Sequence, residues 1–124
     1  MTTSLETVRE FCEAFSSMDA DKLLEFLDDD AVYHNMPMAP VRGKAAIRTV
    51  LDIFLKPAQS VEFVMLNDAA SGNTVLTERL DKFRIDGKPV DLPVAGVFEV
   101  EGGKITSWRD YFDMATWTKQ TSAS

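Results

Sequence analysis

The chain has 124 residues, which is enough for one domain with one hydrophobic core, so we expect a single domain over residues 1–124. Hydrophobic residues make up 45% and charged residues 27%, the ordinary balance of a soluble globular protein. The formal net charge of -7 argues against nucleic acid as a partner, because phosphate binding needs clustered Lys and Arg.

The composition also argues against several kinds of site and location. No run of about 18 apolar residues is present, and the first twenty residues lack signal-peptide character, so we expect no membrane association and a cytoplasmic location. A single cysteine and a single histidine make a zinc site improbable. Cys12 is interpreted as a small buried residue rather than a nucleophile. We expect neither a metal nor a cofactor, and any chemistry must come from carboxylates, Arg, Tyr and amides.

Helices are predicted in the first half of the chain. A first helix begins at the capping box T-S-L-E, residues 3–6, and its apolar residues continue at helical spacing to Phe15. A second begins near Asp19 and ends in the acidic run 28–30, which we interpret as a solvated helix end. A third covers residues 44–55, with apolar residues on one face.

Strands dominate the second half. A short strand, AVYHN at 31–35, precedes an irregular loop at 36–43 that contains two prolines. From residue 60 the pattern alternates as in β-strands, at 60–67, 74–85, 88–100 and 104–113. Helices at one end of the chain and a meander of strands at the other predict an α+β fold. The tail at 118–124 is interpreted as a low-complexity segment.

The turns between the strands fix an expected register. Asp86-Gly87 is a strong two-residue hairpin signal, and it pairs Asp81 with Leu92 and Arg79 with Val94. A three-residue loop at 101–103 would pair Val94 in turn with Asp110. A bulge or a two-residue loop there would instead move Asp110 to the opposite face.

The expected register places an Asp–Arg–Asp array on one sheet face. Arg79 would reach over Val94 to Asp110, and Asp81 would flank it on the other side. An Arg-x-Asp pair alone is more often found at a solvated sheet edge, and the second carboxylate leaves structural and functional interpretations equally open. The expected apolar walls are Val75, Phe83, Leu92, Val94, Trp108 and Phe112.

Three motifs favour the functional interpretation. YHNMP (33–37), ERLD (78–81) and WRDYFD (108–113), in this order and spacing, resemble the limonene-1,2-epoxide hydrolase family over nearly the whole chain. That family has the nuclear-transport-factor-2-like (NTF2-like, also SnoaL-like) fold. The resemblance implies a cone-shaped domain in which three to four helices pack on the concave face of a curved, mostly antiparallel sheet. It also implies a homodimer that hydrolyses a small apolar epoxide, terpene-like or cyclic, to a vicinal diol.

The resemblance also implies roles for five residues. Asp110 would act as base on a water molecule, Arg79 would bridge it to Asp81, and Asp81 would protonate the epoxide oxygen. Tyr33 and Asn35 would help hold the water. By motif position and strand parity, the substrate pocket should include Phe15, Phe54, Phe63, Leu92, Val94 and Trp117, although Phe15 and Phe63 are more simply interpreted as core residues.

Two other classes of function share the expected fold. A ketosteroid-isomerase-like or polyketide-cyclase-like enzyme would move a proton beside a carbonyl group, using a base of raised pKa. A non-catalytic module would need only an apolar pocket for a small ligand. Formation of a diol from an epoxide, compared with isomerisation of an enone, distinguishes the three.

Overall fold

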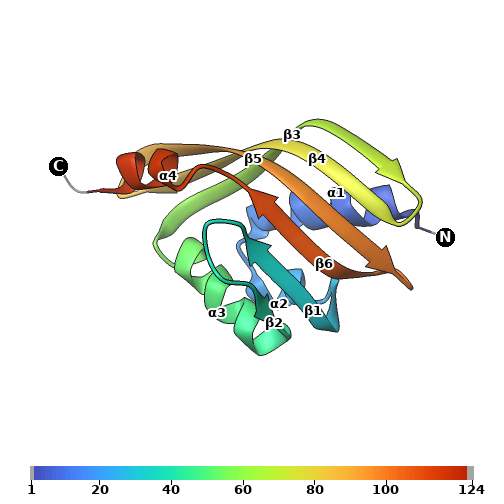
Figure 1. Ribbon diagram of the computed structural model, residues 1–124. Coiled ribbons are helices and arrows are strands. Elements are labelled where there is room, and N and C mark those ends of the chain that lie inside the picture. The colour runs from blue at the N-terminus through green and yellow to red at the C-terminus, as the bar shows by residue number, and fades with distance from the viewer. Residues whose placement is uncertain (1, 123–124) are drawn as a thin grey trace.

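The computed structural model describes residues 2–122 and confirms the predicted α+β class (Figure 1). Over this range it contains the helices α1 (Ser4–Ala14), α2 (Ala20–Leu24), α3 (Lys44–Leu55) and α4 (Met114–Thr121), with the short 3-10 helix η1 (Phe15–Ser17) after α1. The strands are β1 (Leu27–Asn35), β2 (Val41–Arg42), β3 (Ala58–Ser71), β4 (Thr74–Ile85), β5 (Lys88–Glu101) and β6 (Lys104–Tyr111).

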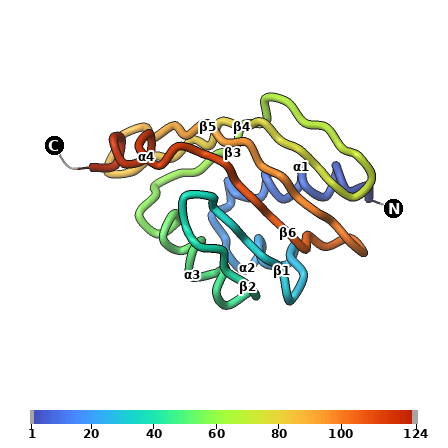
Figure 2. The backbone as a smooth tube through the Cα atoms, viewed as in Figure 1, coloured from blue at the N-terminus to red at the C-terminus, as the bar shows by residue number. Residues whose placement is uncertain are grey.

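The strands form one curved sheet in the order β2-β1-β6-β5-β4-β3. The β1–β6 pair is parallel and the other neighbours are antiparallel. Helices α1, α2 and α3 lie under the curve of the sheet (Figure 1). Helix α4 lies at the end of the sheet where β4 and β5 meet, on the left of Figure 1. The tube in Figure 2 shows that the long strands β3, β4 and β5 make up most of this curve. None of the helices within residues 2–122 is long and apolar enough to cross a membrane.

Helix starts follow the sequence closely. The predicted capping box is present, because the Thr3 hydroxyl accepts a hydrogen bond from the Glu6 N–H and the Glu6 carboxylate accepts one from the Thr3 N–H. Asp19 caps α2 by accepting from the N–H groups of Asp21 and Lys22. The predicted bounds of the third helix, 44–55, are confirmed by α3.

Three local predictions are wrong, wholly or in part. The acidic run 28–30 is not a helix end, because α2 ends at Leu24 and the run lies inside β1. Leu27 and Val32, on either side of the run, pair with Ile105 and Ser107 of β6, and this pairing keeps the intervening residues within the strand. The predicted irregular loop at 36–43 also contains the short strand β2, and part of the predicted low-complexity tail belongs to α4. Residues 123–124 lie outside the described range.

The sequence signal for the start of α4 is Asp113, the residue before the helix. The Asp113 carboxylate accepts from the Ala115 N–H and from the Thr116 hydroxyl, as an N-cap does. The predicted strand 104–113 includes Asp113, so the sequence pattern alone does not predict α4. The side-chain amide of Gln120 then joins α4 to the backbone of Asp91 in β5 by two hydrogen bonds of 2.8 Å.

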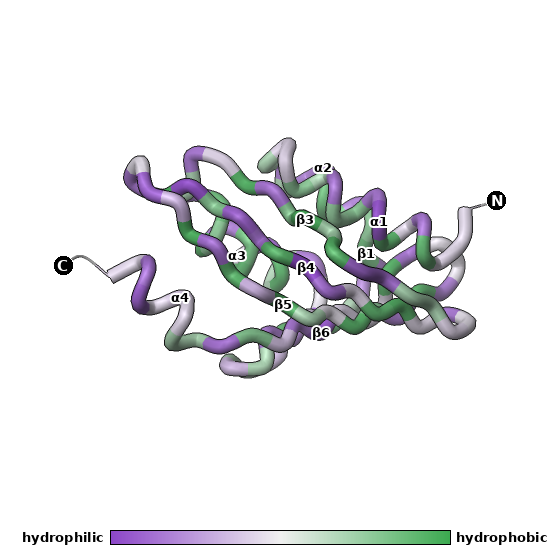
Figure 3. The backbone as a smooth tube through the Cα atoms, turned by 90° about the horizontal axis from the view of Figure 1, so that it is seen from above, coloured by the Kyte–Doolittle hydropathy of each residue, from purple (hydrophilic) through white to green (hydrophobic). Residues whose placement is uncertain are grey.

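Burial alternates along β4, as the sequence predicts for a strand with one covered face. The odd-numbered residues from Val75 to Phe83 are buried, whereas Leu76 and Glu78 on the other face are exposed. Figure 3 shows hydrophilic and hydrophobic residues interspersed along the strands. In β4 the colours do not follow burial, because the buried face includes the hydrophilic Thr77, Arg79 and Asp81. The concave face packs against α1, where the Phe11 ring meets Phe98 and Trp108 edge-on.

The predicted register of β4 against β5 is confirmed, since Asp81 opposes Leu92 and Arg79 opposes Val94. The predicted register of β5 against β6 is wrong by two positions. The loop contains two residues, 102–103, rather than three, and Asp110 opposes Gly96 rather than Val94.

A two-residue loop alone would have turned Asp110 to the convex face. A β-bulge restores its direction: residues 99–100 oppose Ser107 and Ile105, which leaves Thr106 as an extra residue in β6. The loop and the bulge each reverse the parity, so together they return Asp110 to the concave face. The expected face is therefore right although the expected pairing is not.

Candidate active site

Residues from four neighbouring strands meet in one polar row on the concave face. Asn35 of β1 opposes Asp110 of β6, Asp110 opposes Gly96 of β5, and Gly96 opposes Thr77 of β4. Arg79 follows two residues after Thr77 and therefore points to the same face. The row ties side chains that are far apart in sequence to the fixed spacing of a sheet.

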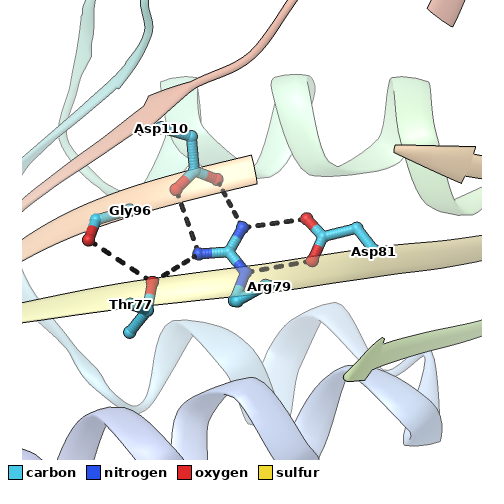
Figure 4. Close-up of polar contacts among 5 residues, drawn as sticks. All are labelled: Thr77, Arg79, Asp81, Gly96 and Asp110. Carbon is cyan, nitrogen blue, oxygen red and sulfur yellow. Dashed lines mark hydrogen bonds and ion pairs between the residues drawn. The ribbon is translucent and has the colours of Figure 1, made fainter. Parts of the chain in front are cut away.

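Arg79 binds both carboxylates through paired hydrogen bonds (Figure 4). Its Nε and Nη2 donate to Oδ1 and Oδ2 of Asp81 at 3.0 and 2.8 Å. Its Nη1 and Nη2 donate to Oδ1 and Oδ2 of Asp110 at 3.1 and 3.0 Å. Nη1 also donates to the Thr77 hydroxyl at 3.3 Å. A guanidinium has five N–H groups, and all five have partners here.

The three charged groups are almost fully removed from solvent, with Arg79 1%, Asp81 3% and Asp110 4% exposed. Arg79 is the only Lys, Arg or His among the buried residues of the range 2–122. One cation facing two carboxylates leaves one negative charge without compensation in a poorly solvated place. Protonation of one carboxyl near neutral pH relieves that excess.

Burial favours the protonated form of the Asp81 carboxyl. Burial raises the pKa of Asp81 to about 6, and the neighbouring Asp110 adds to the rise, whereas Arg79 opposes it. The pKa of Arg79 lies well above its ordinary value, because its two carboxylate partners outweigh the effect of burial. Arg79 therefore stays charged while the carboxyl pair exchanges its proton.

Tyr33 and Asn35 lie on the same face of β1, next to Asp110. Burial raises the pKa of Tyr33 well above its usual range, and the negative charge of Asp110 adds to this effect. The hydroxyl is therefore a neutral donor at any working pH. Its ring stacks on Trp108 with centroids 3.7 Å apart, which fixes its direction.

An apolar cavity of about 410 Å³, including the open space at its mouth, borders these polar groups. Both aspartates contribute to its wall, together with Tyr33 and Asn35. The apolar lining consists of Phe15, Leu51, Phe54, Leu55, Phe63, Phe83, Leu92, Val94 and Phe112.

The predicted pocket residues fall into two groups. Phe15, Phe54, Phe63, Leu92 and Val94 line the cavity, as do the expected wall residues Phe83 and Phe112. Trp117, Val75 and Trp108 are outside the lining as described for residues 2–122. Trp117 packs edge-on against Phe54 and Phe83, and so supports the wall from behind.

Four residues near the site were missed by sequence reasoning. Leu51 and Leu55 of α3 line the cavity, whereas the helical pattern predicts only an apolar core position for Leu51 and gives no signal for Leu55. Thr77 and Gly96 contact or closely approach Arg79, and no sequence motif pointed to them. The β4–β5 register pairs Thr77 with Gly96, and the bulge in β6 pairs Gly96 with Asp110. A sequence signal for that bulge would therefore have placed Thr77 and Gly96 beside Arg79.

Phe63 has a more specific position than a core residue. The Cζ atom of Arg79 lies 4.8 Å from the centroid of its ring, within the range of a cation–π contact. The ring of Phe15 stacks on the ring of Phe63, with the two centroids 4.0 Å apart. The two rings thus form an apolar support for the guanidinium as well as a wall of the cavity.

The remaining candidate groups lie outside this chemistry. His34 opposes Arg109 on the other face of the sheet, so it is directed away from Tyr33 and Asn35. Cys12 is buried, and burial raises the pKa of its thiol to about 12, which leaves it protonated.

Comparisons with known proteins agree with the motifs. Residues 2–123 match the family described as limonene-1,2-epoxide hydrolase catalytic domain. Epoxide hydrolase EphG of Mycobacterium tuberculosis is 38% identical over 107 residues, which cover 86% of this chain and 71% of that protein. The chain belongs to the limonene-1,2-epoxide hydrolase family.

Solved structures extend the comparison to the fold. A limonene-epoxide-hydrolase-like epoxide hydrolase of M. tuberculosis superposes with a TM-score of 0.81 at 36% identity, over 94% of this chain and 87% of that one. A Shewanella putrefaciens protein described as SnoaL-like superposes with a TM-score of 0.85 at 16% identity, over 97% and 96% of the two chains. The second likeness concerns the fold alone, and it confirms the expected NTF2-like, SnoaL-like architecture.

The raised pKa of Asp81 leads to a prediction about stability. Because folding raises this pKa from 3.8 to about 6, the folded protein binds the proton more tightly than the unfolded chain does. The resulting stabilisation is complete below about pH 4 and is lost as the pH rises through 6. Asp81→Asn removes this dependence. We expect the free energy of unfolding of the variant, relative to the wild type, to rise by about 2 kcal/mol between pH 4 and 7.

Urea unfolding of both proteins across this pH range measures the difference, and the comparison cancels the titration of the carboxyls that lie away from Arg79. A difference that stays constant, or that falls with rising pH, would place the buried proton on another group.

Proposed function

We propose that this protein is a cofactor-independent epoxide hydrolase that adds water to a small apolar epoxide and releases a vicinal diol. The observation that carries the proposal is the single guanidinium bound to two buried carboxylates at the wall of an apolar cavity. Family membership supports the reaction class, and the geometry of the site supports the way in which the reaction proceeds.

Epoxide opening needs an acid and a base at the same time. The ring oxygen leaves carbon as an alkoxide, which is a poor leaving group unless a proton reaches it. Water is a weak nucleophile unless a proton is removed from it. One carboxyl and one carboxylate joined by Arg79 supply both functions, because the charge imbalance keeps a single proton on the pair.

We assign the base to Asp110. It is the carboxylate that opposes Asn35, and Tyr33 lies two residues before Asn35 on the same face of β1. A water molecule among these three groups would donate one proton to Asp110 while the amide of Asn35 and the hydroxyl of Tyr33 hold its oxygen. Arg79 occupies the other side of Asp110 and keeps its carboxylate plane fixed.

We assign the acid to Asp81, whose pKa of about 6 keeps it protonated over a useful part of the pH range. Both of its oxygens accept from Arg79, yet each retains a second lone pair that can carry the proton toward the cavity. Transfer of that proton to the epoxide oxygen, together with transfer from water to Asp110, leaves the pair with the same number of protons as before. Exchange of one proton between the carboxyls then restores the starting state.

The lining of the cavity supports an apolar substrate. The polar groups that line it are concentrated on the sheet, whereas α3 contributes Leu51, Phe54 and Leu55. A terpene-like or cyclic hydrocarbon body would contact these side chains and expel water from them, and its epoxide would face the carboxyls.

An isomerase or a polyketide-cyclase-like enzyme is a poorer fit to the same residues. Proton transfer between two carbon atoms of a substrate has no use for groups that hold a water molecule, and a guanidinium bound to both carboxylates makes each of them a weaker base. A binding module would gain nothing from three buried charges, whose desolvation costs several kcal/mol.

The array itself gives the first functional prediction. Asp110→Asn and Asp81→Asn should each lower diol formation from cyclohexene oxide or limonene oxide by about 10²–10⁴-fold. Arg79→Ala should be equally inactive and less stable, because it leaves two close carboxylates without their cation. Turnover measured by chromatography of the diol, with circular dichroism as the check on folding, provides the test.

Asp113→Asn is the matched control, because Asp113 is the last residue of the motif WRDYFD (108–113), which also contains Asp110, and it caps α4 outside the cavity. It should retain wild-type turnover. Wild-type turnover by folded Asp110→Asn, or isomerisation of an enone substrate without diol formation by the wild type, would contradict the proposal.

Val94 tests the substrate cavity. It lines the cavity and opposes Arg79, so a larger side chain there changes the position of the substrate relative to the carboxyls. Val94→Ile should alter the ratio of diol enantiomers or regioisomers from limonene oxide, with a stability change below about 1.5 kcal/mol. Chiral chromatography of the products measures the ratio, and an unchanged ratio would place this side chain outside the substrate site.

The homodimer implied by family membership stays a prediction, which sedimentation velocity tests. The exposed apolar side chains Leu66, Leu76 and Tyr111 are available for such a contact.

A further inference from the structure

Gly96 lies in the interior of β5, where a glycine weakens a strand and needs a reason. Its backbone is ordinary extended strand, unlike the turn glycines 102–103, whose φ values are positive. Its conformation therefore does not require glycine, and the reason has to be sought in the space around its Cα.

That space is occupied by the array. A Cβ atom added at Gly96 would lie 2.5 Å from Nη1 of Arg79, 2.7 Å from the Thr77 hydroxyl and 2.8 Å from Oδ1 of Asp110. All three distances are too short for a real contact. Because Gly96 has no side chain, Nη1 of Arg79, the Thr77 hydroxyl and Oδ1 of Asp110 fit into this space. Figure 4 shows Gly96 beside Thr77, whose hydroxyl is joined to Arg79.

Thr77 completes the arrangement. Its hydroxyl donates to the backbone oxygen of Gly96 at 3.3 Å and accepts from Nη1 of Arg79 at 3.3 Å. Because its single proton is directed to Gly96, an oxygen lone pair is left for Arg79. The Thr77 hydroxyl therefore accepts from the fifth N–H of Arg79 and adds no negative charge. The site already has two carboxylates for one cation.

We infer that Thr77 and Gly96 are positioning residues of the active site, which hold Arg79 in the one orientation that serves both carboxylates. The inference rests on the proposed hydrolase function and deepens it. The cavity lining, as described for residues 2–122, includes Asp81 and Asp110 but neither Thr77 nor Gly96. Thr77 acts on the reaction through Arg79, and Gly96 acts through Arg79 and Asp110, so both should affect kcat and leave KM nearly unchanged.

The test compares Thr77→Val, which removes the hydroxyl but keeps the shape, with Thr77→Ser, which keeps the hydroxyl. Thr77→Val should lower kcat for cyclohexene oxide by about 10- to 100-fold with KM within about twofold. Thr77→Ser should retain kcat within about threefold. Gly96→Ala should lower kcat by about 10²-fold or more, because its Cβ displaces Nη1.

Thr106→Val is the matched control. The Thr106 hydroxyl also donates to a β5 backbone oxygen, that of Glu99 at 3.2 Å, but it lies at the bulge away from Arg79. Its kcat should equal that of the wild type. An equal loss in Thr106→Val, an equal loss in Thr77→Ser, or a rise in KM with unchanged kcat would overturn the inference.

A second readout does not depend on turnover. In protein labelled with nitrogen-15 at arginine, the Nη1 protons of Arg79 should exchange slowly with water in the wild type and in Thr77→Ser. Exchange should be faster in Thr77→Val, and Arg79→Lys identifies the signals by their loss. If the wild type converts no epoxide, the proposed function fails and this measurement still decides the inference. Equal exchange in the wild type and Thr77→Val would overturn it, whether or not Gly96→Ala folds.

Discussion

One positive charge between two buried carboxylates is the constraint on which the rest of the structure depends. Burial of three ionisable groups is tolerable only when the geometry of their hydrogen bonds is complete, and the five N–H groups of Arg79 meet that condition. Phe63 packs on the guanidinium, and Gly96 leaves room for it. In the proposed mechanism, the charge that remains in excess keeps one proton on the pair, so that an acid and a base are present together before substrate binds.

The curved sheet makes this arrangement from distant parts of the sequence. The row from Asn35 through Asp110 and Gly96 to Thr77 crosses four strands, and its spacing follows from backbone pairing rather than from side-chain flexibility. The helices under the sheet close the other side of the cavity with apolar side chains. In the proposed function, the polar row of the sheet faces the reacting end of a substrate, and apolar side chains of the strands and of α3 contact its hydrocarbon body.

Sequence reasoning reached the β4–β5 register because Asp86-Gly87 determines it locally. It missed the position of Asp110, since a bulge at Thr106 depends on tertiary packing that brings Ile105 and Trp108 into the same core. It also missed Gly96 and Thr77, because a glycine in a strand has no signature until the neighbouring strands are placed. The motifs identified the reacting groups, whereas the residues that hold them became visible only through the pairing of strands.

The central claim is that the acid and the base act together on water, without an ester between protein and substrate. A carboxylate nucleophile would need a second, activated water to release its ester, and His34 faces away from the site. A single turnover with enzyme in excess, in water enriched in oxygen-18, tests this directly by mass spectrometry of the diol and of the protein. The account predicts heavy oxygen in the first diol and none in the protein. Light oxygen in that diol, with heavy oxygen in Asp110 or Asp81, would contradict it.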